Sequence, residues 1–521
     1  MSPERNEPCS SPLRRKLAFW FAFTVVLGLS AWLRKPGFTQ GGFANHDVGG
    51  ILYNGMLLAA GKLPYVHSVE FKAPGTFYLA WLLADGGRDI ASFQVWANIA
   101  GLGSLAVVML GARQLWGPTQ GVFAGLVYGA HDLVLDTMDA NYVTWAQLPS
   151  VASVVVALVA FRRKCPPLWL FVVAGALACA ATLCKRPAGI ALLVVVVVAA
   201  WSGLQAKPEQ RRVETTKRVA AVFGGVLLAA APVSLHYLAA GEFSALWRGF
   251  VLNEWGWRYV AQGSAIGLGQ APREAAFASA NFLALPLALS AFSLGGLANR
   301  RDRPVVALLL LWSALALGSA ALGFRFYKGY HLLAAAPLSI LAASSAGLFG
   351  QRSLRRWSTR AVALLPALLL LGRQGVLIDA ERTNRMHAHD LGGRAIAKRV
   401  RQMTQPGDTI WVWGWHLWDV YAFTGHLSST RFYKTMELTT SANDSTWRHP
   451  RSPLHFRDDL AARALIDELY DSPPDVIVLG SAVPVREFAE LRGFLRAHYR
   501  RDRKVRLNRV QFWQLREPRR Q

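Results

Sequence analysis

The stretch "FANHDVGGILYNGMLLAAGKLPYVHSVEFKAPGTF", residues 43–77, follows the first long apolar run of the chain and ends where another begins. It contains Asp47, then a run of small and apolar residues, then "GKLPY", Glu70 and "KAP". A passive connector between two apolar helices needs neither this acid nor so much turn chemistry. A carboxylate at a membrane surface can serve as a general base when partial loss of water raises its pKa. Aspartate is also favoured at the start of a helix, so a structural role for Asp47 is the alternative.

The composition is that of a membrane protein. Of the 521 residues, 53% are hydrophobic, and the mean hydropathy of +0.24 is too high for an ordinary soluble chain of this length. The net charge of +25 is spread over short gaps between apolar runs, as the positive-inside rule describes for cytoplasmic loops. A nucleic-acid-binding protein concentrates its basic residues on one polar domain, so no nucleic acid partner is expected. The basic gaps are residues 14–16, 161–164, 207–218, 299–303 and 351–360.

About eleven apolar runs have the length and composition of helices that cross a hydrocarbon core of about 30 Å. They are residues 17–33, 92–112, 115–133, 143–161, 167–184, 187–204, 219–239, 276–297, 304–322, 330–348 and 361–376. We therefore predict a polytopic α-helical membrane protein, with a cytoplasmic tail at 1–16 and a transmembrane domain at 17–376. No cleavage site follows the first run, which indicates a retained anchor. This topology makes residues 34–91 the first external loop and puts every basic gap on the cytoplasmic side.

The four cysteines point to neither a disulfide framework nor a metal site. Cys9, Cys165, Cys179 and Cys184 all lie outside the segments predicted to be external. Disulfides form in oxidising compartments, and the spacing of these four residues matches no metal-binding motif.

After residue 385 the apolar runs give way to alternating helix and strand patterns. "GGRAIAKRVRQM" and "RDDLAARALIDELY" have helical periodicity, whereas "DTIWVWGW" and "PDVIVLG" are typical of strands. A further helix near 484–498 and a strand at 505–516 complete the pattern. We assign residues 377–521 to an extracytoplasmic α/β domain, because an odd number of spans places the C-terminus outside. Its many arginines do not oppose this placement, since long domains translocate largely regardless of charge.

The order of features in the first loop resembles the opening of the GT-C membrane glycosyltransferases. These include the protein O-mannosyltransferases, the lipid A aminoarabinose transferases and related Rgt-like bacterial enzymes. The matching features are the acid at position 47, the short helix, "GKLPY" (61–65) and "EFKAPG" (70–75). The resemblance implies that Asp47 activates the acceptor and that the donor is a sugar linked to a polyprenyl phosphate or pyrophosphate. The loop residues expected to contact substrate are His46, Tyr65, Glu70 and Lys72.

Three later stretches extend the resemblance over nearly the whole chain, in the family's order. "GALACAATLCKRPAGIAL" (175–192) is similar to a helix that ends in a basic turn before a proline on the external side. "FRFYKGYHLLAAAPLSILAA" (324–343) resembles a basic and aromatic turn that leads into a helix with a proline. The segment 406–433 resembles the external domain attached to many bacterial members.

A second acid is expected in or after the second external loop, where the family uses it for the donor or a metal. The stretch 131–147 offers Asp132, Asp136 and Asp139. We select Asp139 as the second catalytic acid, although the position nearest the next helix holds Asn141 rather than an acid. The alternative is that these acids are solvated loop residues. A divalent metal therefore remains an open possibility.

The phosphate of such a donor requires fixed positive groups, which act most strongly where water is scarce. Two predicted external turns supply them. The alternative is that these side chains reach toward lipid headgroups among an interfacial belt of aromatic residues. The candidates for phosphate binding are Lys185, Arg186, Arg325, Lys328 and His331.

These features together predict a glycosyltransferase of the hexosyl or pentosyl class in a bacterial inner membrane. It would move a sugar from a polyprenyl-phosphate donor to a hydroxyl of an envelope glycolipid, polysaccharide or protein. A transporter or flippase is the first alternative, but it calls for matching halves and ionisable residues at mid-membrane. An oligosaccharide ligase or polymerase, which would depend on basic residues without an essential acid in the first loop, is the second alternative.

Overall fold

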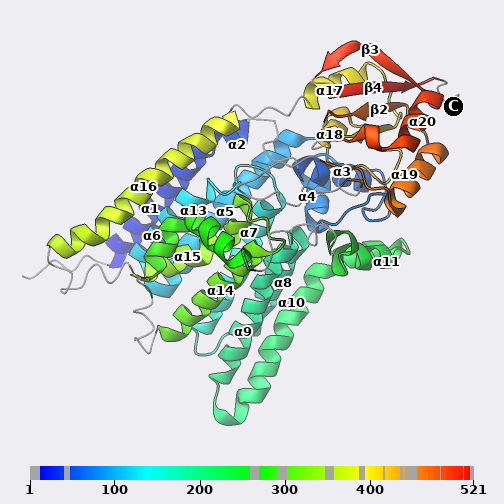
Figure 1. Cartoon of the computed structure of the whole chain (residues 1–521). Coiled ribbons are helices and arrows are strands. Elements are labelled where there is room, and N and C mark those ends of the chain that lie inside the picture. Colours follow the sequence, from blue (N-terminus) through cyan, green and yellow to red (C-terminus); the bar gives the residue numbers. More distant parts are fainter. Residues whose placement is uncertain are drawn as a thin grey trace, which may run out of the picture.

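The computed structural model describes residues 12–39, 47–257, 269–291, 293, 302–345, 357–386, 393–414, 417–434, 438–439, 454–481, 483–507 and 510–516. Within these ranges, a bundle of long helices is followed by a small α/β domain, which lies at the upper right of Figure 1. The predicted fold class, a polytopic helical protein with a small C-terminal sheet domain, is therefore confirmed.

Helices occupy all eleven runs that the sequence marks as apolar. They are α1 (Pro12–Leu33), α5 (Ile90–Trp116), α6 (Pro118–Asp132), α7 (Tyr142–Phe161), α8 (Leu168–Cys184), α9 (Ile190–Leu204), α10 (Arg211–Ala239), α13 (Ala271–Ala291), α14 (Arg303–Ala321), α15 (Leu332–Ser345) and α16 (Trp357–Met386). By length and composition, seven helical stretches of the described residues can cross a membrane. The helices α6, α8 and α15 are shorter, with 15, 17 and 14 residues.

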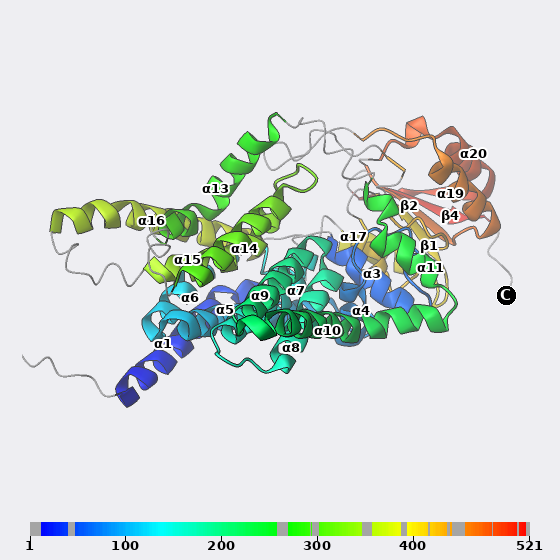
Figure 2. The same cartoon turned by 90° about the horizontal axis from the view of Figure 1, so that it is seen from below.

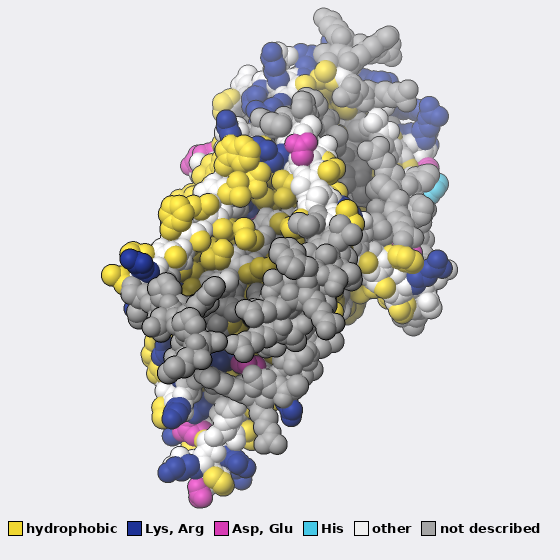
Figure 3. All heavy atoms as spheres, turned by 90° about the vertical axis from the view of Figure 1, so that its left-hand side faces the viewer, with side chains coloured by type: hydrophobic (Ala, Val, Ile, Leu, Met, Phe, Trp, Pro, Cys, Tyr) yellow, Lys and Arg dark blue, Asp and Glu magenta, His cyan; other side chains and the backbone are white. Residues whose placement is uncertain are grey.

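The outer surface of the bundle is apolar. On the face seen in Figure 3, hydrophobic side chains form a broad patch with lysines and arginines above and below it. Leu17, Phe21 and Val25 of α1 are all exposed. Helices whose backbone groups are bonded internally and whose side chains are apolar suit lipid and not water. The chain is thus an integral membrane protein.

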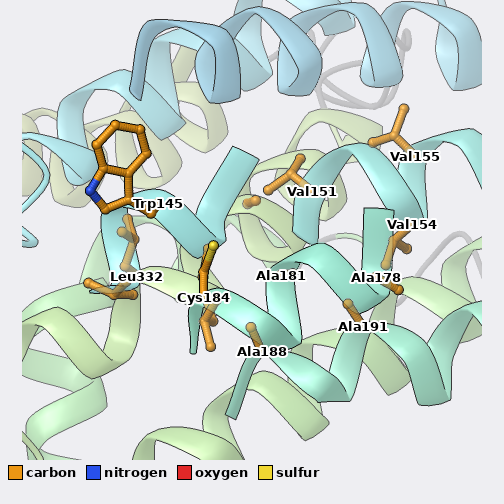
Figure 4. Packing of buried hydrophobic residues seen from close by; sticks show 14 of the residues in the cluster. Trp145, Val151, Val154, Val155, Ala178, Ala181, Cys184, Ala188, Ala191 and Leu332 are labelled. Atoms are coloured by element: carbon orange, nitrogen blue, oxygen red, sulfur yellow. The ribbon is translucent and has the colours of Figure 1, made fainter. Parts of the chain in front are cut away.

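Small residues allow the helices of the bundle to pack closely. Figure 4 shows Val151 of α7, Ala178 and Ala181 of α8 and Ala191 of α9 in one buried cluster. Between α8 and α10 the backbones nearly touch, because a Cβ atom at Gly175 would collide with the carbonyl oxygen of Val222. Close approach through small residues is the usual packing mode of membrane helices.

The helices of the bundle lie on two opposite sides, which can be told apart in Figure 2. Seen from below, α8 and α10 lie on one side and α13 and α14 on the other. Helices α16 and α1 overlap in Figure 1 but lie apart along most of their length in Figure 2. They meet near one end, where Arg382 of α16 donates to the carbonyl of Leu33 at 3.0 Å. The turn between α9 and α10 lies at the bottom of Figure 1, at the opposite end of the molecule from the α/β domain.

The first loop forms α3 (Asp47–Ala59) and α4 (Gly75–Leu83). Helices with one apolar face commonly lie at a membrane interface. Helix α4 does expose Trp81 and Leu82. Helix α3 is instead buried on all sides from Val48 to Leu58, because the α/β domain covers the face that would otherwise meet lipid or water (Figure 1). The apolar pattern of α3 therefore reflects a contact between domains.

The α/β domain has a four-stranded sheet in the order β1-β2-β4-β3. Strand β1 pairs in parallel with β2, whereas β4 is antiparallel to β2 and to β3. The final predicted strand is a hairpin of two strands, β3 and β4, whose registers shift relative to each other. The helices and strands of the α/β domain are α17 (Gly393–Arg401), β1 (Ile410–Trp413), α18 (Asp419–Thr424), α19 (Leu460–Asp471), β2 (Val476–Leu479), α20 (Ala489–His498), β3 (Tyr499–Leu507) and β4 (Val510–Leu515).

Short helical turns complete the chain. They are α2 (Lys35–Thr39), η1 (Arg186–Gly189), η2 (Pro208–Gln210), α11 (Phe243–Leu246), η3 (Trp247–Val251), η6 (Lys328–His331) and η9 (Val485–Glu487). A buried ion pair between Arg34 and Asp132 fixes the loop that joins α6 to α7. Arg34 also donates to the carbonyl oxygen of Thr137 at 3.1 Å and to its hydroxyl at 2.9 Å. Because both charges are fully buried, loss of either partner would leave the other uncompensated.

Candidate active site

Asp47 begins α3 and lies beside Lys72, which comes from the same loop. The Lys72 ammonium nitrogen is 3.4 Å from a carboxylate oxygen of Asp47. The Asp47 side chain is 29% exposed and that of Lys72 is 26% exposed. A carboxylate that is neither fully solvated nor sealed in the core is accessible to a substrate hydroxyl. The pair therefore has the accessibility that a general base needs.

The backbone around Lys72 is held from two directions. The Tyr65 hydroxyl donates to the carbonyl oxygen of Lys72 at 2.6 Å, and the Lys72 N–H donates to the Glu70 carboxylate at 3.0 Å. The ammonium lies 5.2 Å from the ring centre of Tyr142. Tyr65 has a φ angle of 66°, a left-handed conformation that a non-glycine residue adopts at a cost in free energy. Tyr65 and Glu70, both expected to contact substrate, thus shape the segment that carries Lys72.

Lys185 directly follows the last residue of α8, and its own backbone is extended. Its ammonium lies 4.6 Å from the ring centre of Tyr330, and within the described residues no carboxylate forms an ion pair with it. Burial lowers the pKa of Lys185 to about 7, and the positive charge of Lys72 lowers it further. The carboxylates of Asp47 and Asp136 act in the opposite direction on that pKa. Lys185 therefore shares one electrostatic environment with Asp47.

Lys328, on the turn η6, contacts Asp136, one of the two carboxylates that act on Lys185. Its ammonium is 2.9 Å from Asp136 and 2.7 Å from Glu381 of α16. Burial opposes the charged form, but the two carboxylates outweigh it and raise the pKa of Lys328 above its ordinary value. Lys328 therefore stays protonated, and its charge is locally balanced.

The charged groups of four separate segments thus share one site. Asp47 and Lys72 come from the first loop, and Asp136 comes from the loop before α7. Lys185 and Lys328 come from the turns before α9 and α15. The sequence pointed to all four segments, although in the loop before α7 it nominated Asp139 and not Asp136.

Asp139, selected from the sequence as the second acid, and its neighbour Asp136 have different surroundings. Asp139 is buried, and its carboxylate accepts from the Gln94 side chain at 2.5 Å and from the Ala140 N–H at 3.0 Å. Asp136, three residues earlier, is the acid that contacts Lys328. Its φ angle of 66° turns the loop at this point. An irregular loop has no repeating pattern that tells which of its side chains face the same way. The sequence alone therefore could not show which of the two acids would contact Lys328.

The other basic residues nominated for phosphate binding are Arg186, Arg325 and His331, and they have surroundings different from those of Lys185 and Lys328. Arg186 donates to the carbonyls of Gly249 and Phe250, both at 2.8 Å, and so holds the turn η3. Arg325 is 1% exposed. His331 is equally buried, and burial lowers its pKa to about 4, so it is neutral near pH 7. His46 lies outside the described residues.

The site's carboxylates are accompanied by lysines. Lys72 lies against Asp47, and Lys328 lies against Asp136 and Glu381. In the part of the chain that the structure describes, no three His, Cys, Asp or Glu residues come together as ligands of a metal ion.

Sequence reasoning missed Tyr142, Tyr330 and Glu381. It also missed the contacts of the Glu70 carboxylate with Tyr433 and Lys434 of the α/β domain. Glu381 lies five residues beyond the last predicted span, where an acid at the end of a membrane helix was a usable signal. No signal joined the first loop to residues more than 350 positions later.

The fold of this chain, a helical membrane domain followed by a small α/β domain, is similar to that of solved structures over almost its whole length. It aligns with ArnT from Cupriavidus metallidurans bound to undecaprenyl phosphate, with a TM-score of 0.60 and 15% identity over 96% of this chain and 98% of that one. Without the lipid, ArnT gives a TM-score of 0.59 and 14% identity over 94% and 97%. Neither a comparison with protein-family models nor one with curated proteins found a match.

A second solved protein shares the fold. The archaeal oligosaccharyltransferase AglB from Archaeoglobus fulgidus, in complex with an inhibitory peptide and a dolichol-phosphate, aligns with a TM-score of 0.53. The identity is 14%, over 88% of this chain and 69% of that one. At such identities the likeness establishes the fold, and the chemistry has to come from the site.

Proposed function

We propose that the protein is a membrane glycosyltransferase that moves a sugar from a polyprenyl-phosphate donor to an acceptor hydroxyl. The observation that carries the proposal is the shared site of Asp47 and Lys185. It combines an accessible carboxylate with an ammonium that no carboxylate of the described residues pairs with. One group suits the removal of a proton and the other suits a phosphate.

In the proposed reaction Asp47 takes the proton of the acceptor hydroxyl as its oxygen attacks the anomeric carbon. The bond between that carbon and the phosphate oxygen breaks, and the polyprenyl phosphate leaves with the electron pair. Lys185 binds the phosphate, whose charge is greatest as the bond breaks. Fixed cations stabilise such developing charge most where little water is present.

The polyprenyl carrier is supported by the lipids in the two structural neighbours, undecaprenyl phosphate in ArnT and dolichol-phosphate in AglB. We assign an analogous lipid donor to this chain because Lys185 lies between two apolar helices of the membrane domain, α8 and α9. The sugar is a hexose or a pentose, and the acceptor belongs to an envelope glycolipid, polysaccharide or protein. The reaction needs no organic cofactor, and a divalent metal remains a possible addition.

The test is turnover by the purified protein in liposomes with synthetic polyprenyl phosphates that carry different hexoses and pentoses. We expect release of free polyprenyl phosphate from one class of donor, increased by the matching acceptor. Empty liposomes and lipid-linked sugars with a pyrophosphate bridge serve as controls. Failure to consume any monophosphate donor while transporting the intact lipid across the bilayer would favour a flippase and reject the proposal.

We further propose that the site faces the outside of a bacterial inner membrane, with the N-terminus in the cytoplasm. The basic turn between α9 and α10 lies at the opposite end of the molecule from the α/β domain (Figure 1). Basic connections are retained on the cytoplasmic side. The α/β domain and Asp47 are then extracytoplasmic.

This orientation predicts the accessibility of Cys165, an exposed thiol before α8. Helix α8 has 17 residues and is therefore about 26 Å long, and Lys185 follows its other end. In a Cys9→Ser background, an impermeant maleimide should label Cys165 in permeabilised spheroplasts and not in intact ones. A Gly493→Cys variant, at an exposed position of the α/β domain, should be labelled in intact and in permeabilised spheroplasts alike. Labelling of Cys165 in intact spheroplasts would invert the proposed topology.

A further inference from the structure

Glu70 joins the first loop to the α/β domain through a fully bonded carboxylate. One oxygen accepts from the Tyr433 hydroxyl at 2.6 Å, from the Asn54 amide at 3.2 Å and from the Lys434 ammonium. The other oxygen accepts from the N–H groups of Phe71 at 2.8 Å and Lys72 at 3.0 Å. One side of this carboxylate thus faces the α/β domain, and the other side fixes the segment that carries Lys72.

The ion pair at the centre of this network is almost completely buried. Glu70 is 1% exposed and Lys434 is 2% exposed. Burial alone would raise the pKa of Glu70, but the charge and hydrogen bonds of Lys434, with those of Tyr433, outweigh it and lower the pKa. The ammonium also lies within 5.5 Å of the ring centres of Phe71, Trp418 and Tyr433. A buried charge held on all sides permits very little movement.

The same contact reaches the start of α3. A Cβ atom at Gly49 would lie 2.7 Å from the backbone nitrogen of Asp419. One at Gly50 would lie 3.1 Å from the Lys434 side chain. The two glycines therefore let the α/β domain approach the helical turn that begins with Asp47. The domain touches both segments of the Asp47–Lys72 pair.

We propose that Lys434 is a positioning residue for the transfer reaction, which acts through Glu70 on the backbone of Lys72 and so sets the Lys72 ammonium beside Asp47. The α/β domain thereby completes the active site from outside the membrane domain, without contacting the reacting atoms. This inference rests on the proposed function, because the consequence of the positioning is catalytic.

Turnover should fall when Lys434 is replaced by methionine, which has similar length and no charge. Glu70 is left buried without its cation, and the backbone of Lys72 shifts as Glu70 turns toward water or takes up a proton. We expect kcat per folded molecule to fall about 10- to 100-fold, since small misplacements of catalytic groups have effects of this size. The KM for the donor should stay within about twofold, because the Lys185 turn is not touched. Lys398→Met, on an exposed face of the same domain, is the matched control and should retain wild-type kcat.

A double variant tests the route of the effect. In Lys434→Met with Glu70→Gln, no charge is left unpaired, and the amide oxygen can still accept from the N–H groups of Phe71 and Lys72. We expect kcat to return to within about threefold of the wild type. If the double variant is as slow as the single one, Lys434 does not act through Glu70 and the inference fails. If Lys434→Met alone keeps its kcat, the residue has only a structural role and the inference also fails.

Two further measurements separate this inference from the proposed function. Labelling of Lys72 by an amine-reactive reagent, followed by mass spectrometry, needs no turnover. It should be several-fold faster in Lys434→Met and return to the wild-type rate in the double variant, and unchanged labelling would overturn the inference even if the protein transfers no sugar. Should Lys434→Met fail to fold, Tyr433→Phe removes one donor to Glu70 and keeps the ion pair. It should lower kcat about three- to tenfold, and an unchanged kcat there would also reject the inference.

Discussion

Asp47→Asn is expected to lower sugar transfer about a thousand-fold, the range that removal of a general base produces. Asparagine keeps the shape of the side chain but cannot accept a proton from the acceptor hydroxyl. Donor binding should be retained, because Lys185 is separate from the exchanged group. The measurement is release of polyprenyl phosphate by the purified variant in liposomes, together with equilibrium binding of the donor.

The matched control for this variant is Asp85→Asn. Asp85 is an exposed acid of the same loop, with a φ angle of 46° that asparagine tolerates well. It should express, insert and turn over as the wild type does. If Asp47→Asn retained more than about a tenth of the wild-type rate, Asp47 would be a helix cap and not the base.

Lys185→Met should raise the KM for the donor about 10- to 100-fold, because a charge-assisted hydrogen bond to phosphate contributes roughly 1.5–3 kcal/mol. The variant keeps the length and the apolar stem of the side chain. Rates at saturating donor should change less than the KM. A donor KM within about twofold of the wild type would remove Lys185 from the phosphate site and weaken the proposed function as a whole.

The pH dependence gives a second measurement on the same residue. Lys185 has a pKa of about 7, lowered by burial and by Lys72 and opposed by Asp47 and Asp136. The phosphate binds the protonated form, so donor affinity should be highest below pH 7 and fall by up to tenfold for each pH unit above it. Lys185→Met should abolish this slope, and the two proteins should converge at high pH. A donor KM that stays constant from pH 6 to pH 9 in the wild type contradicts the assignment.

Most helices of the membrane domain could be predicted from the sequence. Each of the eleven apolar runs coincides with a helix, because a bilayer demands long apolar segments and leaves few alternatives. Asp47, Lys72, Lys185 and Lys328 were also nominated from sequence, and they share one site. In each case a charged residue at the edge of an apolar run carried the signal.

What the sequence could not predict depends on contacts between distant segments. The pattern of α3 indicates an apolar helix, but only the docked α/β domain explains why Gly49 and Gly50 are both glycine. Glu70 was expected to contact substrate, whereas its partners Tyr433 and Lys434 come from the other domain. The contact of Asp136 with Lys328 depends on an irregular turn that no propensity predicts.

The junction of Glu70 with Lys434 also has a consequence for biogenesis. The ribosome makes the first loop more than 350 residues before it makes the lysine that orders it. A nascent chain that has inserted every membrane helix therefore still lacks an ordered Asp47–Lys72 pair. Under the proposed role of Lys434, the site is complete only when the last domain has been synthesised and folded, and an incomplete chain cannot carry out the proposed transfer.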